Sequence, residues 1–529
     1  MDPGVTGVAD TLAPPRPAPS GPPALPGQPG RPAGPPPRPG RTRELGWFSA
    51  ACIAVAILIM IFISAAGPSS AVVTTPRPSL GPPWWFPLPL PVAPVTMLLW
   101  MATVLGVVGV AAALVAVARG ARPPIRLLVA AALITTAVFT VLPAAGSSDT
   151  LDYAAYGRMV VLGHDPYKLT PRQLRRMGDP VGRTAPHAWQ KDHSDYGPLA
   201  TLEQATAAEL GGTSTATIIF WLKLWNALAF GLVVIVLDRL LRRDPARRAR
   251  VHLLWSLNPL LLWGLLASGH VDAVAVACGL SGLVLVKAWQ PGEEPQLLKF
   301  LAAGALAGAA TDLKITYALF GLGVAWAGRK SLSALLAAGS GALAVLVPSY
   351  LWFGRSAIMV LANHRDATSD TLYRIFGHSF LHPTLPEVWL VILPVCAVVA
   401  LLLLRRLPER LPEIPAILPT FALSLAWMLA WPYQRPWYDA AVLCLLVFFQ
   451  ASRLDWVILA QLAVSTFEFM PGMPSFPPRH SWLGSLLGDQ VNWFVPTARL
   501  AVLAALIGLC VTRAWYARRP AAASLVRVT

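Results

Sequence analysis

Residues 45–66 read LGWFSAACIAVAILIMIFISAA, an apolar run without a charged side chain. A transmembrane helix needs about 20 residues of this kind. Similar runs recur along the 529-residue chain, in which 55% of the residues are hydrophobic and only 13% are charged. Because an average soluble domain is about 25% charged, a soluble globular protein is excluded. The sequence predicts an all-α polytopic membrane protein.

The apolar runs predict about fourteen transmembrane helices. Two neighbouring pairs of runs are short and nearly loopless, around Ser268-Gly269-His270 and around Thr311-Asp312-Leu313-Lys314, and such hairpins could stop partway across the bilayer. The runs lie at 45–66, 94–118, 124–146, 215–241, 251–268, 270–289, 299–312, 314–328, 331–353, 386–404, 414–432, 437–452, 453–470 and 496–516.

Charge and composition predict how the chain is oriented. Residues 1–44 contain 14 Pro and almost no large apolar side chain, which is typical of a disordered tail. Lys and Arg cluster at every second loop, and such clusters favour the cytoplasm. Both tails, 1–44 and 520–529, are therefore predicted to be cytoplasmic around a membrane domain at 45–519. The net charge of +16 is then explained by the membrane, and no nucleic acid is expected. The outward loops are predicted at 67–93, 147–214, 354–385, 433–436 and 471–495.

The first long outer loop carries the strongest candidate for chemistry. Asp149 follows the end of an apolar run, so its carboxylate should lie near the lipid headgroups and be partly desolvated. A carboxylate in that position could act as a general base. It could also cap a helix that is predicted to start at Leu151, because Asp and Ser are good N-cap residues. Spacing alone favours the cap.

The sequence also bears on the substrates. It contains no Asp-x-Asp pair and no GxxxxGK[ST] loop, so a nucleotide-dependent enzyme is not expected. The five cysteines lie in apolar stretches outside any CxxC motif, which predicts neither a metal site nor a cofactor. A donor reachable from the outer face is a lipid-linked sugar phosphate, whose single phosphate can be bound by Arg, Lys and His.

A set of motifs in this loop and beyond it is specific in order and spacing. They are Ser148-Asp149-Thr150-Leu151-Asp152-Tyr153, Gly157-Arg158, Gly163-His164-Asp165-Pro166-Tyr167, Trp189 and Tyr196-Gly197-Pro198-Leu199, followed by Asn258-Pro259-Leu260, Gly269-His270-Val271-Asp272-Ala273, Lys314 and Pro436-Trp437-Tyr438. Together they resemble the actinobacterial polyprenyl-phosphomannose-dependent α-1,6-mannosyltransferases of the GT-C superfamily, over roughly residues 45–520.

The resemblance implies a membrane-embedded inverting glycosyltransferase of GT-C type, whose long first outer loop is catalytic. It implies that Asp149 is the general base and that a mannosyl residue moves from polyprenyl phosphate to an outward-facing mannan or glycolipid acceptor. The implied location is the bacterial plasma membrane, with the active site on its extracytoplasmic face. The motif residues of the loop are the implied substrate contacts: Asp152, Tyr153, Arg158, His164, Asp165, Tyr167 and Tyr196.

Two helix-hairpin tips supply further candidates. Polar residues inside a membrane are costly and usually functional. His270 and Asp272 are therefore either donor-binding residues or a structural hydrogen-bonded pair. Lys314 either binds the phosphate or pairs with Asp312.

Two outer segments complete the set of candidates. His364 and Arg365 either hold the leaving phosphate or are solvated loop charges. In the segment around Arg435, the aromatic residues either form an interfacial belt or stack on a sugar through Trp437 or Tyr438, with Arg435 near the phosphate.

Three other functions remain open from the sequence. The donor could carry glucose, arabinose or galactose on the same polyprenyl phosphate. A transporter or flippase for lipid-linked sugars would also suit many spans with charged residues inside the membrane. The third is a non-catalytic scaffold that uses the Pro-rich tail for docking.

Overall fold

The computed structural model describes residues 39–73, 75–78, 80–186, 189–287, 294–363, 371–376, 384–407, 415–472 and 481–515. These residues are predominantly helical, as predicted. The named strands among them are two short ones, β1 (Ala66–Gly67) and β2 (Phe86–Pro87), which pair in parallel. His364, Arg365, most of the predicted N-terminal tail and the tail at 520–529 lie outside the described residues.

Six helical stretches among the described residues are long and apolar enough to cross a membrane. They are Thr42–Ala65, Val92–Ala118, Thr215–Leu240, Leu332–Phe353, Val388–Arg406 and Trp482–Thr512. A seventh span is possible if Pro245–Ala267 and Asp272–Leu285, which are bent by 113° at their junction, are counted as one broken span. This break falls at the predicted hairpin around Ser268-Gly269-His270.

The predicted count of about fourteen full spans is not confirmed. Several predicted runs form shorter helices, such as α11 (Leu297–Leu313) with 17 residues and α19 (Arg453–Glu468) with 16 residues. Four further helices are apolar but also too short to be counted as full spans: Ile125–Val141, Ile315–Gly328, Ile417–Ala430 and Pro436–Leu446.

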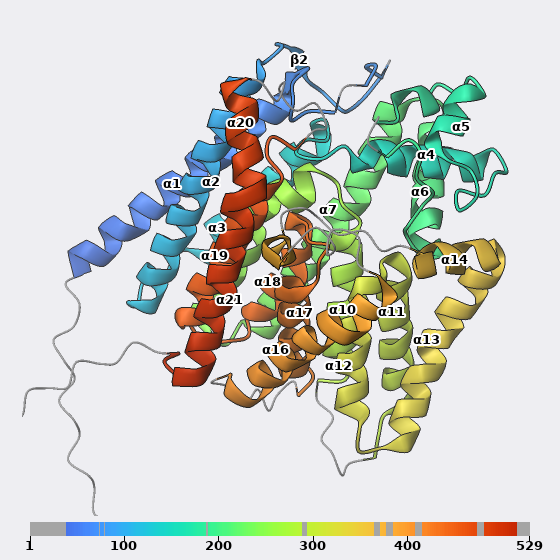
Figure 1. The fold of residues 1–529 in the computed structure, drawn as a ribbon. Helices are drawn as coiled ribbons and strands as arrows, with labels where there is room; N and C mark the ends of the chain where they lie inside the picture. The colour runs from blue at the N-terminus through green and yellow to red at the C-terminus, as the bar shows by residue number, and fades with distance from the viewer. Residues whose placement is uncertain are drawn as a thin grey trace, which may run out of the picture.

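Figure 1 labels most of the helices. The first half contains α1 (Pro39–Ala65), α2 (Val92–Ala118), α3 (Ile125–Val141), α4 (Asp149–Val161), α5 (Pro171–Arg176), η1 (Gly182–Thr184), α6 (Pro198–Gly211), α7 (Thr215–Leu240), α8 (Pro245–Val251), η2 (His252–Ser256), α9 (Pro259–Leu261), η3 (Leu262–Ala267) and α10 (Asp272–Leu285). The second half contains α11, η4 (Ile315–Tyr317), α12 (Ala318–Gly328), α13 (Leu332–Phe353), α14 (Arg355–Asn363), η5 (Leu372–Phe376), α15 (Leu385–Glu387), η7 (Val388–Ile392), α16 (Leu393–Arg406), α17 (Ile417–Ala430), η8 (Pro436–Tyr438), α18 (Asp439–Leu446), α19, α20 (Trp482–Asp489), η9 (Gln490–Phe494) and α21 (Val495–Thr512).

The long predicted outer loop folds into a helical unit of its own. Helices α4, α5 and α6 gather at one end of the bundle, at the upper right of Figure 1. Helices α4 and α6 approach closely because Gly157 has no side chain, and a Cβ there would overlap the carbonyl oxygen of Gln204. A Cβ on Gly197 would likewise overlap the carbonyl oxygen of Asp312, so the start of α6 lies against the end of α11. The unit is therefore docked on the membrane helices.

Small residues also bring the membrane helices together. Gly304 on α11 lies against the backbone of Ala338 on α13, and Gly341 on α13 lies against the backbone of Leu301. Such contacts are typical of helix packing in lipid, where close van der Waals contact replaces the hydrophobic effect as the driving force. These contacts fix α11, the helix that ends at the predicted site residue Lys314.

Candidate functional site

Asp149 lies at the first position of helix α4. Ser148 is the N-cap residue and makes no side-chain capping hydrogen bond, while the backbone N–H of Asp149 donates to Oγ of Ser147 at 3.2 Å. The predicted helix start at Leu151 was therefore wrong by two residues, because Ser148 already serves as the N-cap residue. The position of Asp149 inside the helix also removes the interpretation of this residue as the N-cap.

The carboxylate of Asp149 lies in a mostly buried site. Its side chain is 17% exposed, and its Oδ2 is 3.8 Å from Nδ1 of His270. Burial raises the pKa of Asp149 to about 6, against the opposing effects of the Ser147 hydrogen bond and of the charges on Arg435 and Lys314. A carboxylate with this pKa is mostly ionised at pH 7 and is a stronger base than an exposed aspartate.

His270 occupies the break between η3 and α10 and is fully buried. Its ring stacks on Trp437, with centroids 3.5 Å apart. Its Nδ1 is 3.1 Å from the hydroxyl of Tyr153, which is itself 2.8 Å from the hydroxyl of Tyr196. Four predicted residues from distant parts of the sequence therefore meet next to Asp149.

Asp272 and Lys314 form a second part of the same cluster. Nζ of Lys314 donates to both carboxylate oxygens of Asp272, at 3.1 and 3.2 Å, and the hydroxyl of Tyr317 donates to Oδ1 at 2.8 Å. The ammonium group of Lys314 also lies 4.2 Å from the ring centroid of Tyr438 and 5.7 Å from that of Tyr196. Burial favours such a paired arrangement for both charges.

Two of the predicted pairings do not form. His270 and Asp272 have different hydrogen-bond partners and do not pair with each other. Lys314 pairs with Asp272, and not with Asp312 as the sequence suggested. Asp312 instead accepts hydrogen bonds from the backbone of Leu199 and from the hydroxyl of Ser349. The reason is the local backbone. Helix α11 ends at Leu313, and Lys314 has an extended backbone (φ −160°), so Lys314 is no longer part of the helix that carries Asp312.

Arg435 belongs to a network of buried charges. It donates to Oε1 of Glu468 at 2.7 Å, and Arg499 donates to the other oxygen of Glu468. The guanidinium group also lies near the rings of Tyr433 and Phe469. The sequence predicted Arg435 as a site residue but not its partnership with Glu468 and Arg499. Their signal was that both are charged residues within otherwise apolar runs.

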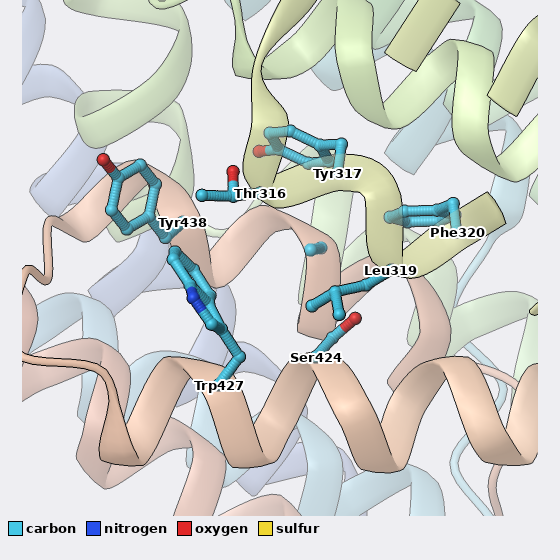
Figure 2. A pocket seen from close by; sticks show the side chains of 8 residues that line it. Thr316, Tyr317, Leu319, Phe320, Ser424, Trp427 and Tyr438 are labelled. Carbon is cyan, nitrogen blue, oxygen red and sulfur yellow. The ribbon is translucent and has the colours of Figure 1, made fainter. Parts of the chain in front are cut away.

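A small pocket lies beside the Lys314 cluster, between α12 and α17 (Figure 2). It shares Tyr317 and Tyr438 with that cluster, and its other walls are apolar or aromatic apart from two hydroxyl groups. Within the described part of the chain, the hydroxyls of Thr316 and Ser424 have no hydrogen-bond partner. The lining residues are Thr316, Tyr317, Leu319, Phe320, Ser424, Trp427, Tyr438 and Ala441.

Asp152 lies one turn along α4 from Asp149. Its side chain is buried, and neither carboxylate oxygen has a hydrogen-bond partner among the residues that the structure describes. Burial, together with the negative charges of Asp149, Asp195 and Asp192, raises the pKa of Asp152 well above its usual range. Its surroundings therefore favour the protonated form of Asp152.

Four predicted residues lie within the outer helical unit, away from the cluster around Asp149. Arg158 pairs with Asp179 at 2.9 Å, and His164 is half-buried after the end of α4. Asp165 accepts from Ser356 at 2.8 Å and pairs with Lys168. The hydroxyl of Tyr167 donates to the carbonyl of Tyr196 at 2.9 Å and so supports a residue of the cluster. A direct substrate contact of these four residues stays a prediction.

Among the described residues, no group of three or more His, Cys, Asp or Glu side chains is placed to hold a metal ion. The donor set around Asp149 is one carboxylate and one imidazole, next to ammonium and guanidinium groups. The arrangement is suited to proton transfer and to the binding of an anion.

The fold and this site define an all-helical protein with apolar helices of membrane-spanning length and an acid–cation site at the ends of its helices. Residues 51–330, which carry Asp149, His270, Asp272 and Lys314, match the family described as alpha-(1->6)-mannopyranosyltransferase, N-terminal domain. The chain belongs to this family, which confirms the resemblance seen in the sequence.

Two curated relatives are similar over shorter segments. One is named a probable alpha-(1->6)-mannopyranosyltransferase of Mycolicibacterium smegmatis and is 28% identical over 152 residues, which is 28% of this chain and 27% of the relative. The other, an alpha-(1->6)-mannopyranosyltransferase of Mycobacterium tuberculosis, is 27% identical over 139 residues, or 26% of this chain and 23% of the relative. The aligned segments thus span about a quarter of each relative's length.

Proposed function

We propose that this protein is a GT-C type mannosyltransferase that moves a mannosyl residue from polyprenyl phosphate mannose to an outward-facing mannan or glycolipid, forming an α-1,6 linkage. The family and the names of the two relatives support mannosyl transfer. The observation that carries the mechanism is the buried carboxylate of Asp149, whose pKa is about 6 and which lies between an imidazole and two cations.

Asp149 serves as the general base in this proposal. It takes the proton from the acceptor hydroxyl while that oxygen attacks the anomeric carbon of the donor. The bond from the anomeric carbon to the phosphate oxygen breaks in the same displacement, which inverts the anomeric configuration. Because the pKa of Asp149 is about 6, the proton-free form dominates at pH 7 and still has a useful affinity for the proton.

Lys314 and Arg435 are the proposed ligands of the leaving phosphate. Both act electrostatically on Asp149, so both lie near the place where the phosphate would depart. Asp272 and Glu468 hold these two cations at the site. Charge-assisted hydrogen bonds from Lys and Arg are among the strongest that a phosphate can receive. His364 and Arg365 remain predicted ligands of the same phosphate.

The lipid part of the donor also has a candidate location. The pocket of Figure 2 is walled by apolar and aromatic side chains and shares Tyr438 with the Lys314 cluster. An apolar prenyl chain attached to a phosphate at Lys314 could begin there. The proposal places the active site on the extracytoplasmic face of the bacterial plasma membrane, since lipid-linked sugars are the donors available there.

The test is a transfer assay on purified full-length protein in detergent, with radiolabelled polyprenyl phosphate mannose and short α-mannoside acceptors. Wild type should form product, and Asp149→Asn should lose about 10²- to 10⁴-fold in rate, as expected for a general base. Glu209→Gln is the control, because it removes a carboxylate from the same outer helical unit at an exposed position on α6. Normal turnover by Asp149→Asn would overturn the role of the base.

The donor is tested in the same assay. Transfer from polyprenyl phosphates that carry glucose, arabinose or galactose, but not mannose, would replace mannose in the proposal. Movement of a lipid-linked sugar across a proteoliposome membrane without any transfer would instead support the transporter hypothesis.

A further inference from the structure

Helix α7, one of the membrane-spanning helices, contains a lysine in its interior that the sequence analysis did not single out. Lys223 is 1% exposed. A buried cation inside a span is costly and is retained where it has a partner and a function. Here the partners are backbone groups, because Nζ donates to the carbonyl oxygens of Leu142 at 2.7 Å and Pro143 at 3.1 Å.

These two carbonyl groups open the segment that leads to Asp149. Helix α3 ends at Val141, and the chain then runs through 142–148 into α4. The middle of the segment is held by backbone hydrogen bonds, from Ala145 to the carbonyl of Ala267 at 3.1 Å and from Gly146 to that of Ala71 at 2.7 Å. Lys223 therefore adds side-chain hydrogen bonds at the start of the segment, directly after α3 has ended.

The same lysine also packs against the turn that carries His270. Gly269 has a φ of +72°, and a Cβ there would lie 3.0 Å from Cγ of Lys223 and 3.1 Å from Cγ2 of Thr150. One turn further along α7, Nδ2 of Asn226 donates to the carbonyl of Gly269 at 3.4 Å. One face of α7 thus contacts both chain segments that meet at the site.

We propose that Lys223 is a positioning residue for glycosyl transfer: its ammonium group fixes the segment that carries Asp149, its stem fixes the turn that carries His270, and together they set the distance between the two. Lys223 does not touch the reacting groups. The inference rests on the proposed function, since it assumes that Asp149 is the base.

The test compares Lys223→Met, which keeps the length of the stem and removes the charge, with Lys223→Arg, which keeps donors for the two carbonyls. Lys223→Met should lower kcat about 10- to 100-fold, as expected when a catalytic group is misplaced by a fraction of an ångström to one ångström. The KM values for donor and acceptor should stay within about threefold, because no substrate contact is removed. Lys223→Arg should recover most of the loss.

A control separates positioning from general destabilisation. Phe230→Ala removes a 1%-exposed ring from the same helix, further from the site, and should lower the melting temperature with an unchanged kcat. If Lys223→Met behaved like Phe230→Ala, the positioning role would be overturned.

A readout that does not need activity keeps the two proposals distinguishable. In hydrogen–deuterium exchange, peptides covering 142–148 and 268–271 should exchange faster in Lys223→Met than in wild type or Lys223→Arg. Faster exchange, with no transfer by wild type from any donor, would support the positioning role of Lys223 and contradict the proposed function. Unchanged exchange in both peptides would overturn the positioning role itself.

Discussion

The carboxylate of Asp149 lies 3.8 Å from Nδ1 of His270, and the same nitrogen lies 3.1 Å from the hydroxyl of Tyr153. Nδ1 thus faces a carboxylate and a phenol at once. If it carries a proton it donates to the hydroxyl of Tyr153, and if it does not, it accepts from that hydroxyl. Because the ring stacks on Trp437, a change of tautomer reverses the direction of this hydrogen bond while the ring keeps its place beside Asp149.

The pH dependence of transfer should report Asp149. The base works only when ionised, so kcat/KM should rise with pH through a single acid limb near pH 6 and then level off. An Asp149→Glu variant that retains activity should show a displaced limb. A flat rate between pH 4.5 and 7.5, measured over that range in mixed buffers, would contradict this assignment.

The position of this limb should respond to the neighbouring charges with a defined sign. Arg435 lowers the pKa of Asp149, so Arg435→Gln should move the limb to higher pH, while Asp195 raises it, so Asp195→Asn should move the limb to lower pH. Opposite displacements in the two variants, measured on kcat/KM, are the expected outcome. Displacements in the same direction would point to an indirect effect on folding.

Lys314→Met should weaken binding of the donor. Loss of one charge-assisted hydrogen bond to phosphate corresponds to about a 10- to 100-fold weaker affinity. Binding of a non-reactive polyprenyl phosphate, measured by titration of intrinsic Trp fluorescence, checks this prediction. Lys299→Met is the matched control. Lys299 is exposed on the first turn of α11, the helix that ends just before Lys314, so its substitution should have no effect on binding.

Filling the pocket of Figure 2 should weaken binding of the donor through the start of its lipid chain. Ser424 lines the pocket, so Ser424→Leu should raise KM about tenfold for a full-length prenyl donor through loss of apolar contact area. A donor truncated to a short chain should be affected to the same extent, because it keeps the part of the chain next to the phosphate. Ser424→Ala removes only the hydroxyl and should behave like wild type. An unchanged KM in Ser424→Leu would place the lipid elsewhere.

Glu203 on α6 predicts a pH dependence of stability. Burial raises its pKa to about 8, and neither carboxylate oxygen has a hydrogen-bond partner among the described residues. The unfolded chain loses this proton near pH 4.5 and the folded chain near pH 8, so stability falls as pH rises between these values. Glu203→Gln should raise the melting temperature at pH 8.5 much more than at pH 5. Equal shifts at both pH values would contradict the burial of this carboxyl group.

The sequence predicted the helical membrane fold and most of the residues that meet at the site. Asp149, His270 and Lys314 could be found because charged and polar residues at the ends of apolar runs are costly unless they have a function, and Tyr153 because its motif resembles that of the family. Their partners could not be predicted, since each contact joins segments that are far apart in the chain. The pairing of Lys314 with Asp272 depends on how the backbone leaves α11, which no local pattern specifies.

Two other features were beyond sequence reasoning for different reasons. The predicted count of about fourteen full spans is not confirmed by the described helices, because hydropathy does not distinguish a helix that crosses the bilayer from a shorter one packed among others. Lys223 carried the same signal as Glu468 and Arg499, a charge within an apolar run, but its role could not be predicted because its partners are backbone carbonyls that leave no side-chain signature.

The start of α4 at Asp149 has a further consequence. The first residues of a helix leave backbone N–H groups without helical partners, and their partial positive charge stabilises a nearby anion by about 0.3–1 kcal/mol. The ionisation of Asp149 therefore depends on the order of the first turn of its own helix. Fraying of that turn would remove this stabilisation and make the carboxylate harder to ionise. A substitution that loosens the turn without touching any charged residue would then slow the reaction at pH 6 while leaving it nearly normal at pH 8.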